Sequence, residues 1–196
     1  MTVSFDKKLG KGFTGNFDQE LRLFDNMSRV NLTFSNFSVD YKVSKVFKVS
    51  LAYRFILKNQ DTYYSKRHRV YADFTLHDKF KKLNLAYRLR LQGQERDIFS
   101  SDKGTTVESY MRHKFTLEYN CRKFTPYVAA EFRFQFYNPH QEVANGQWNR
   151  GRYYVGTEYE LSKKNVLNGY FMLQRDYNVL FYQADYTWGV QYSHSF

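Results

Sequence analysis

The stretch LNLAYRLRLQ, residues 83–92, alternates strictly between two kinds of side chain. Its odd positions are apolar: Leu83, Leu85, Tyr87, Leu89 and Leu91. Its even positions are small or polar: Asn84, Ala86, Arg88, Arg90 and Gln92. Successive residues of a β-strand point to opposite faces, so this period of two predicts a strand with one apolar and one charged face. The fold depends on which of these faces lies inside.

The same alternation recurs along the chain, for example in KVSLAYRFIL (48–57), PYVAAEFRFQF (126–136) and YTWGVQYSHSF (186–196). By this template we expect eleven strands, at residues 2–9, 13–24, 32–43, 46–57, 68–77, 82–94, 110–120, 125–137, 150–161, 166–176 and 184–196. These runs are long for strands of soluble proteins. Their length matches tilted strands that cross a membrane, which need roughly 9–11 residues.

Composition supports an all-β chain with one domain. Aromatic residues make up 20% of the 196 residues, yet the mean hydropathy is −0.69, so apolar and polar residues must be interleaved. No Pro/Gly/Ser-rich linker is present, and we predict a single transmembrane β-barrel domain over residues 1–196. No run of about 18 apolar residues and no basic-then-apolar signal peptide occurs. With Cys121 as the only cysteine, we expect no internal disulfide, metal site or cofactor.

Short and long connections alternate between the predicted strands. The short ones are residues 9–12, 43–46, 78–81, 120–123 and 161–165, and the long ones are 25–30, 58–67, 95–109, 138–149 and 177–183. This asymmetry is typical of an antiparallel up-and-down outer-membrane barrel, with its short turns on the periplasmic side. The first and last strands would then run in the same direction. Because single-chain barrels usually have even strand numbers, we predict 10–12 strands. We favour 12 strands, with an N-terminal truncation of the chain. The alternative is a barrel of 10 strands in which residues 1–9 form a separate segment.

The polar face indicates that the charges lie in the lumen. It carries both signs of charge, and arginine outnumbers lysine: Asp18, Glu20, Arg22, Asp40, Arg54, Arg69, Asp73, Arg88, Arg90, Arg112, Glu118, Glu131, Arg133, Arg152, Glu158 and Glu160. Arginine paired with carboxylates suits a confined space away from bulk water. The apolar face would then contact lipid. A soluble lipid-binding barrel, with the apolar face inside, is the alternative.

The location of the charged residues also explains the net charge of +11. On a soluble protein it would suggest a nucleic-acid partner. Here the short turns and their flanks carry much of it, and we expect a basic rim: Lys45, Lys48, Lys79, Lys81, Lys82, Arg122, Lys123, Lys163 and Lys164. Such a rim would face phospholipid phosphates, so membrane lipid and not nucleic acid is the predicted partner. The simpler alternative is that these lysines keep the turns soluble.

The order of these segments resembles the domain-of-unknown-function family numbered 2490, outer-membrane barrels of Bacteroidetes-type bacteria. The resemblance rests on FDKKLGKGFTGNFDQELRLFDN (5–26) and DYKVSKVFKVSLAYRF (40–55), followed by LNLAYRLRLQ, TPYVAAEFRF (125–134) and RYYVGTEYELSKKN (152–165). It implies the barrel fold and a location in the outer membrane of a Gram-negative bacterium. It supplies no activity and no catalytic residues.

The histidines offer little sign of catalysis. His113 shares a face with Ser109, but four residues along a strand separate them by about 13 Å, so they cannot form a dyad. His77 shares the lumen face with Asp73, where a structural pair is expected. We therefore predict that the protein is not an enzyme, and a lipid-modifying activity ranks third among the functions. The longest connection, residues 95–109, is expected to be a surface loop; a constriction in the lumen is the alternative.

Two other functional classes remain. The first is a structural or accessory envelope protein with a salt-bridged lumen, which engages another envelope protein or lipopolysaccharide. The second is a small, porin-like passive channel. Acidic and basic residues nearly balance on the polar faces, so we expect charge pairing across the lumen and low conductance.

The last strand carries a further prediction. Trp188, Val190, Tyr192, His194 and Phe196 form its alternating aromatic face, and Phe196 ends the chain. This pattern resembles the C-terminal signal that the outer-membrane insertion machinery recognises. That machinery is therefore an expected partner.

Overall fold

The computed structural model describes residues 1–60, 62–97, 105, 107–139, 145–178 and 184–196. Within them the chain forms eleven strands and no helix that is long and apolar enough to span a membrane. The strands are β1 (Thr2–Gly10), β2 (Phe13–Phe24), β3 (Arg29–Lys42), β4 (Phe47–Asn59), β5 (Tyr64–Phe80), β6 (Leu83–Arg96), β7 (Val107–Tyr119), β8 (Phe124–Tyr137), β9 (Gln147–Ser162), β10 (Asn165–Asp176) and β11 (Ala184–Ser195). They follow the order predicted from the alternation.

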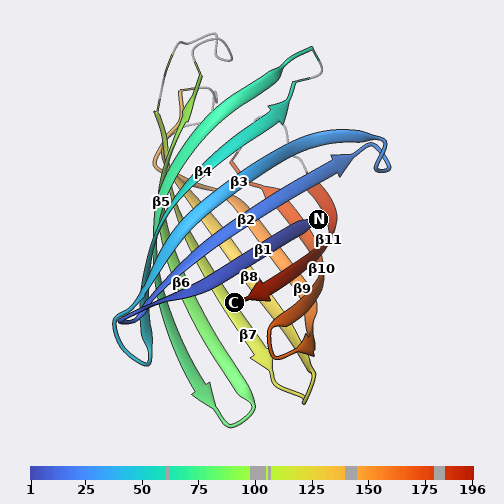
Figure 1. The fold of residues 1–196 in the computed structure, drawn as a ribbon. Coiled ribbons are helices and arrows are strands. Elements are labelled where there is room, and N and C mark those ends of the chain that lie inside the picture. Colours follow the sequence, from blue (N-terminus) through green and yellow to red (C-terminus); the bar gives the residue numbers. More distant parts are fainter. Residues whose placement is uncertain (61, 98–104, 106, 140–144, 179–183) are drawn as a thin grey trace.

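All these strands belong to one closed barrel (Figure 1). Each strand pairs antiparallel with the next, from β1 to β11. The predicted antiparallel up-and-down barrel is confirmed, but the favoured count of twelve strands differs from the eleven described. An odd number makes the first and last strands run the same way. The barrel closes because β1 and β11 form a parallel pair, whose slanted hydrogen bonds join two such strands directly.

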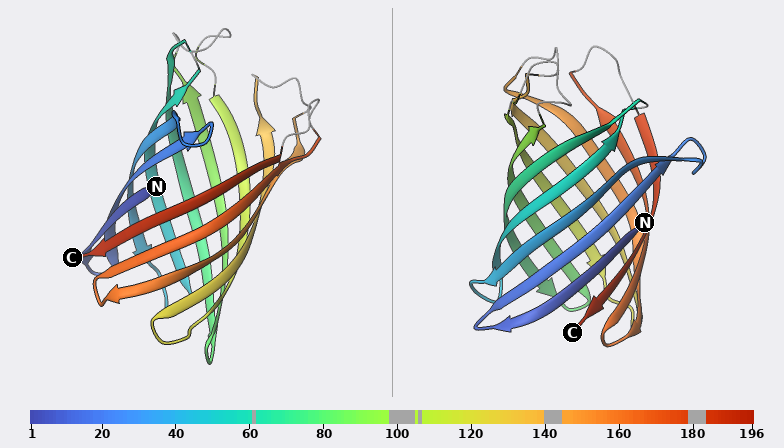
Figure 2. Two further views of the ribbon diagram at one scale, coloured as in Figure 1. Left: turned by 90° about the vertical axis from the view of Figure 1, so that its right-hand side faces the viewer. Right: turned by 45° about the horizontal axis from the view of Figure 1, so that its top comes forward.

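The seam between β1 and β11 is short. Its register runs from Thr2 opposite Gln191 to Asp6 opposite Ser195. The N-terminal ammonium donates a hydrogen bond to the carbonyl oxygen of Leu21 at 2.8 Å, and it lies part of the way up the barrel wall (Figure 2). Phe196 continues the seam at its other end, where its backbone N–H donates to the Asp6 carbonyl at 3.0 Å.

Tight turns connect the strands at one end of the barrel, where positive φ angles reverse the chain within two residues. Lys11 and Gly12 have φ angles of 49° and 84°, Lys81 has 54° and Arg122 has 56°. These left-handed conformations match the right-handed twist of the strands that they join. The longer connections gather at the opposite end (Figure 1).

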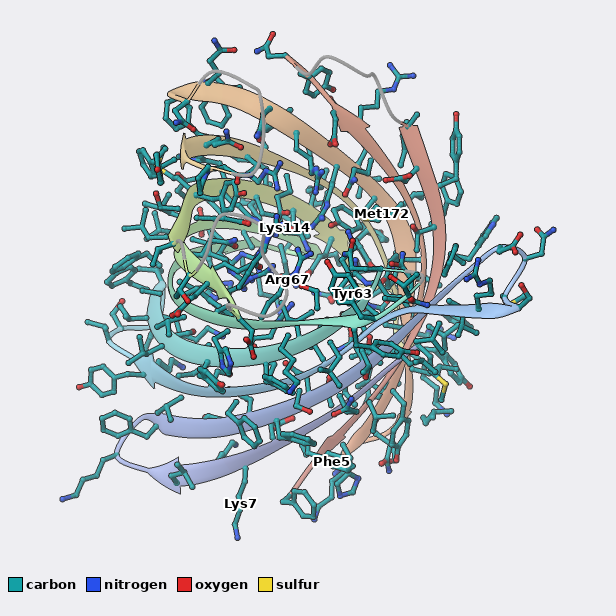
Figure 3. All side chains as sticks on the ribbon, turned by 90° about the horizontal axis from the view of Figure 1, so that it is seen from above. Phe5, Lys7, Tyr63, Arg67, Lys114 and Met172 are labelled. Carbon is teal, nitrogen blue, oxygen red and sulfur yellow. The ribbon has the colours of Figure 1, made fainter. Side chains whose placement is uncertain are left out.

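The apolar face of every strand points away from the lumen. Trp188 is 82% exposed, Leu51 63% and Val155 55%. Figure 3 shows Phe5 and Lys7 outside the barrel and Arg67, Lys114 and Met172 on its inner side. Soluble proteins rarely expose an apolar belt of this extent, so the belt is the surface of a membrane barrel. The soluble alternative, with its apolar face inside, is wrong.

Glycines on the inner face make room for tyrosine rings on neighbouring strands. Gly156 pairs with both Tyr127 and Tyr170, and Gly189 pairs with Tyr170. A Cβ atom at Gly156 would lie 2.7 Å from the Gly169 carbonyl oxygen and 2.8 Å from the Tyr127 ring. These rings lie flat across β8–β11 only because the glycines have no side chain.

Replacement of Gly156 by alanine is expected to lower the free energy of unfolding by about 1–3 kcal/mol, because overpacking forces backbone and ring to shift. Gly169→Ala is the matched control, since a Cβ there meets nothing within 4 Å. Urea unfolding in phospholipid vesicles measures the free energy of unfolding of both variants. Equal stability of the two variants would contradict the role of Gly156.

Candidate functional site in the barrel lumen

The inner wall carries charged side chains that are almost completely buried. The exposed fraction is 7% for Asp73, Arg90, Arg112 and Arg133, and 5% for Glu131. They come from β5, β6, β7 and β8, where alternation turns every second side chain inward. The lumen is therefore densely filled at this level, and each charge needs a partner inside the barrel.

A buried bidentate pair joins Arg90 to Asp73. The Arg90 Nε and Nη2 atoms each donate to one carboxylate oxygen of Asp73 at 2.7 Å. The guanidinium carbon also lies 3.8 Å from the centre of the Tyr71 ring. Because Asp73 and Arg90 are directly opposite on β5 and β6, the bidentate geometry follows from the strand register.

Glu131 on β8 is shared by three arginines. Arg88 Nη2 lies 2.7 Å from one of its oxygens, and Arg152 Nη1 and Arg112 Nη1 lie 3.4 and 3.5 Å from the other. Arg88 and Arg112 come from β6 and β7, and Arg152 comes from β9. One carboxylate thus helps to neutralise a cluster that spans four strands.

Four further charged residues form pairs that the sequence interpretation did not select. Arg150 and Asp176 form a bidentate pair at 2.5 and 2.7 Å, and Arg96 lies 2.8 Å from Glu108. They continue the inward alternation toward the long-loop ends of the strands. Arg96 and Glu108 lie just outside the strands predicted at 82–94 and 110–120, so extending those strands would have identified them. Arg150 and Asp176 are the end residues of the strands predicted at 150–161 and 166–176.

Arginines also face each other directly across neighbouring strands. Arg90, Arg112, Arg133 and Arg150 are consecutive cross-strand partners over β6–β9. We call this row the arginine ladder. Like charges in directly opposite positions destabilise a sheet. The carboxylates Asp73 and Asp176 neutralise the two ends of the ladder, while its middle members have weaker partners.

Several arginines are held mainly by neutral groups. Arg133 donates to Asn149 Oδ1 at 2.8 Å and lies 4.6 Å from the Tyr110 ring centre. Arg69 donates to Gln94 Oε1 through Nε at 3.0 Å and also through Nη2. Arg54, the cross-strand partner of Arg69, donates to Asn36 Oδ1 at 3.1 Å. Charge neutralisation is thus uneven along the wall, although the acidic and basic residues of the predicted lumen set balance.

The other predicted lumen residues lie outside this cluster. Glu20 contacts its neighbour Arg22, Asp18 accepts a hydrogen bond from Asn36 at 3.0 Å, and Glu118 accepts one from Asn84 at 3.3 Å. Glu158 is half-buried and Glu160 is exposed near the short turns.

The predicted basic rim lies at the short-turn end. Lys48 differs from the other members because it faces the lumen and contacts Asp40 at 2.8 Å. The remaining members are exposed: Lys45, Lys79, Lys81, Lys82, Arg122, Lys123, Lys163 and Lys164. Lipid contact by this rim stays a prediction.

The histidines contact neutral groups. His113 Nδ1 lies 2.7 Å from the Tyr87 hydroxyl on the outer face, and His68 Nδ1 lies 2.7 Å from the Tyr53 hydroxyl. His77 is exposed, while Asp73 is bound to Arg90. Among the described residues, no group of three or more His, Cys, Asp or Glu side chains could hold a metal ion. Most of the connection at 95–109 lies outside the described residues.

The aromatic face of the last strand points outward. Trp188 and Val190 are exposed, and Tyr192 Oη and His194 Nδ1 each lie 2.7 Å from Asn165 Oδ1. The Phe196 ring is 4.7 Å from the His194 ring and 6.3 Å from the Phe5 ring, by their centroids. Phe196 is therefore a peripheral lipid-side contact at the end of the seam.

Deletion of Phe196 is expected to impair membrane insertion more than it impairs the stability of the folded barrel. The deletion removes few packed contacts, whereas the insertion machinery would lose the last residue of its signal. The yield of heat-modifiable barrel in cell membranes, compared with urea unfolding of the refolded protein, measures the two effects. Normal assembly of the shortened chain in cells would contradict the prediction.

Comparisons with known proteins bear on the fold and the family of the chain. None of the curated proteins compared with the chain matches it. A solved structure titled the NanC porin in a rhombohedral crystal form superimposes with a TM-score of 0.51, over 96% of each chain and at 13% identity. At that identity, the likeness establishes the porin-like barrel fold alone. The family described as "Protein of unknown function (DUF2490)" matches residues 1–180. Because this match covers most of the 196 residues, the chain belongs to that family.

Proposed function

We propose that the protein is a narrow, low-conductance channel for small solutes in the outer membrane of a Gram-negative bacterium. One observation carries this proposal: arginines face arginines across neighbouring strands of the lumen wall. A barrel with a purely structural lumen has no need of cations held by neutral groups, as Arg54, Arg69 and Arg133 are, because apolar packing or complete pairing is more stable. Charge that is retained at a cost is typical of a solute pathway.

The burial of the wall sets the conductance that we expect. Arg90, Arg112 and Arg133 have exposed fractions of only 7% in the described residues. Side chains this close together leave little room for hydrated ions, so currents should be far smaller than those of wide porins.

A second candidate is a structural or accessory barrel that engages another envelope protein or lipopolysaccharide and has no enzymatic activity. The same burial favours it, because a lumen closed at mid-height would leave the outer wall and the exposed rim lysines as the functional surfaces. The insertion machinery and membrane lipids are proposed partners in either case.

Recording from single proteins in planar lipid bilayers distinguishes these candidates. The narrow channel should give small, stepwise and reproducible currents. The currents of the Arg112→Leu variant should differ in amplitude from those of the wild-type protein, because Arg112 lies at the filled level of the lumen. The absence of steps from folded, inserted protein would refute the channel and favour the accessory role.

A further inference from the structure

We propose that the lumen wall contains a binding site for small oxyanions, formed by Arg69, Arg112 and the side-chain amide of Gln92. The ligand class is a solute that carries a carboxylate or a phosphate group. This inference rests on the proposed channel function and names its substrate class. It is argued from the register, the burial and the unused hydrogen-bonding atoms of these residues.

Register gives Gln92 four diagonal neighbours that carry charge, the cations Arg69 and Arg112 and the carboxylates Asp73 and Glu108. On the inner face of β6, Gln92 is opposite Tyr71 of β5 and Tyr110 of β7. Arg69 is opposite Gln94, and Arg112 is opposite Arg90, so each arginine is a diagonal neighbour of Gln92. Diagonal neighbours in a sheet are about 7–8 Å apart, so the Gln92 amide is within reach of each guanidinium group. Arg69 also acts electrostatically on Arg112.

The Gln92 side chain lacks a partner among the described residues. It is only 5% exposed, and within that part of the chain neither its amide nitrogen nor its carbonyl oxygen makes a hydrogen bond. A buried amide without partners costs about 1–3 kcal/mol, so a sequence without a use for it would place an apolar side chain there. The Nε atom of neighbouring Arg112 also lacks a hydrogen-bond partner. Both groups offer unused N–H donors to the same part of the lumen.

The electrostatic surroundings favour an anion. The charged groups that act most strongly on Arg69 are Arg54, Arg90 and Arg152, all of them cations. For Arg112 they are Glu131 and then Arg152, Arg69 and Arg133. Arg90 and Arg96 pair with the nearby carboxylates of Asp73 and Glu108, so the field between Arg69 and Arg112 remains positive in spite of Glu131. An oxyanion there would accept hydrogen bonds from the guanidinium groups and from the Gln92 amide N–H group.

Isothermal titration of the refolded barrel in neutral detergent with sodium phosphate, and separately with sodium acetate, tests the site. Both anions should bind, and their affinity should fall as NaCl is raised. Arg69→Gln and Arg112→Gln should each weaken phosphate binding about tenfold, the effect of losing one charge-assisted contact. Lys163→Gln removes the same charge at an exposed turn and should leave binding unchanged.

Gln92→Met separates binding from folding. Methionine has a similar volume and removes an amide that lacks partners, so the barrel should fold normally while phosphate binding weakens. Undetectable phosphate and acetate binding by the folded wild-type barrel would overturn the proposal. So would binding that the Arg69, Gln92 and Arg112 variants leave unchanged.

The titration tests the anion site and the bilayer recordings test the channel, so either proposal can fail without the other. Phosphate binding that depends on Arg69 and Arg112, in a barrel without single-channel steps, would retain the anion site and remove the channel. Stepwise currents from a barrel without phosphate binding would retain the channel and remove the anion site.

Discussion

Replacement of Glu131 by glutamine is expected to lower the free energy of unfolding by about 3–5 kcal/mol, the usual cost of removing one partner from a buried charge cluster. Its carboxylate lies within 3.5 Å of Arg88, Arg112 and Arg152, and its side chain is 6% exposed. Glutamine keeps the shape but not the charge. Three guanidinium groups would then repel one another in a confined space, with no other carboxylate shared among them in the described residues.

Urea unfolding in phospholipid vesicles, followed by the fluorescence of Trp148 and Trp188, would measure this effect by linear extrapolation. Glu160→Gln is the matched control, because Glu160 is exposed near the short turns and should change stability by less than about 0.5 kcal/mol. A Glu131 variant as stable as this control would show that Glu131 does not hold the cluster together.

The second large effect concerns the Arg90–Asp73 pair. Asp73→Val alone should lower the free energy of unfolding by about 3–5 kcal/mol, because it leaves Arg90 charged and buried. The double variant Asp73→Val/Arg90→Met should recover most of this loss. Buried pairs replaced together by apolar groups are often neutral in stability, and methionine retains a contact with the Tyr71 ring.

The double variant therefore distinguishes pairing from packing. Recovery would show that the pair determines properties of the lumen and does not stabilise the folded barrel. A double variant as unstable as Asp73→Val alone would contradict this view, because the loss would then come from packing around position 73. Arg90→Met alone completes the cycle and gives the coupling energy.

Local patterns in the sequence predicted most of the fold. The alternation in residues 83–92 placed Arg88 and Arg90 on one face and Leu89 and Leu91 on the other, as the structure has them. Pattern gave the eleven strand segments and their order as well, because side-chain period and turn length are local properties, whereas the even-number rule led to the favoured total of twelve. Barrel closure was less predictable. The parallel pairing of β1 with β11 joins residues almost the whole chain apart, and no local pattern contains that information.

The chemistry of the lumen shows the same division. The sequence determined that arginines and carboxylates share the inner face, since alternation alone fixes the face of each residue. Which charges meet was decided only by the tertiary structure, because a carboxylate neutralises an arginine only when strand register brings the two together. Register gives Arg90 the carboxylate of Asp73, whereas it gives Arg69 the neutral amide oxygen of Gln94. Equal numbers of acidic and basic residues in the predicted lumen set therefore became an uneven field in the folded lumen.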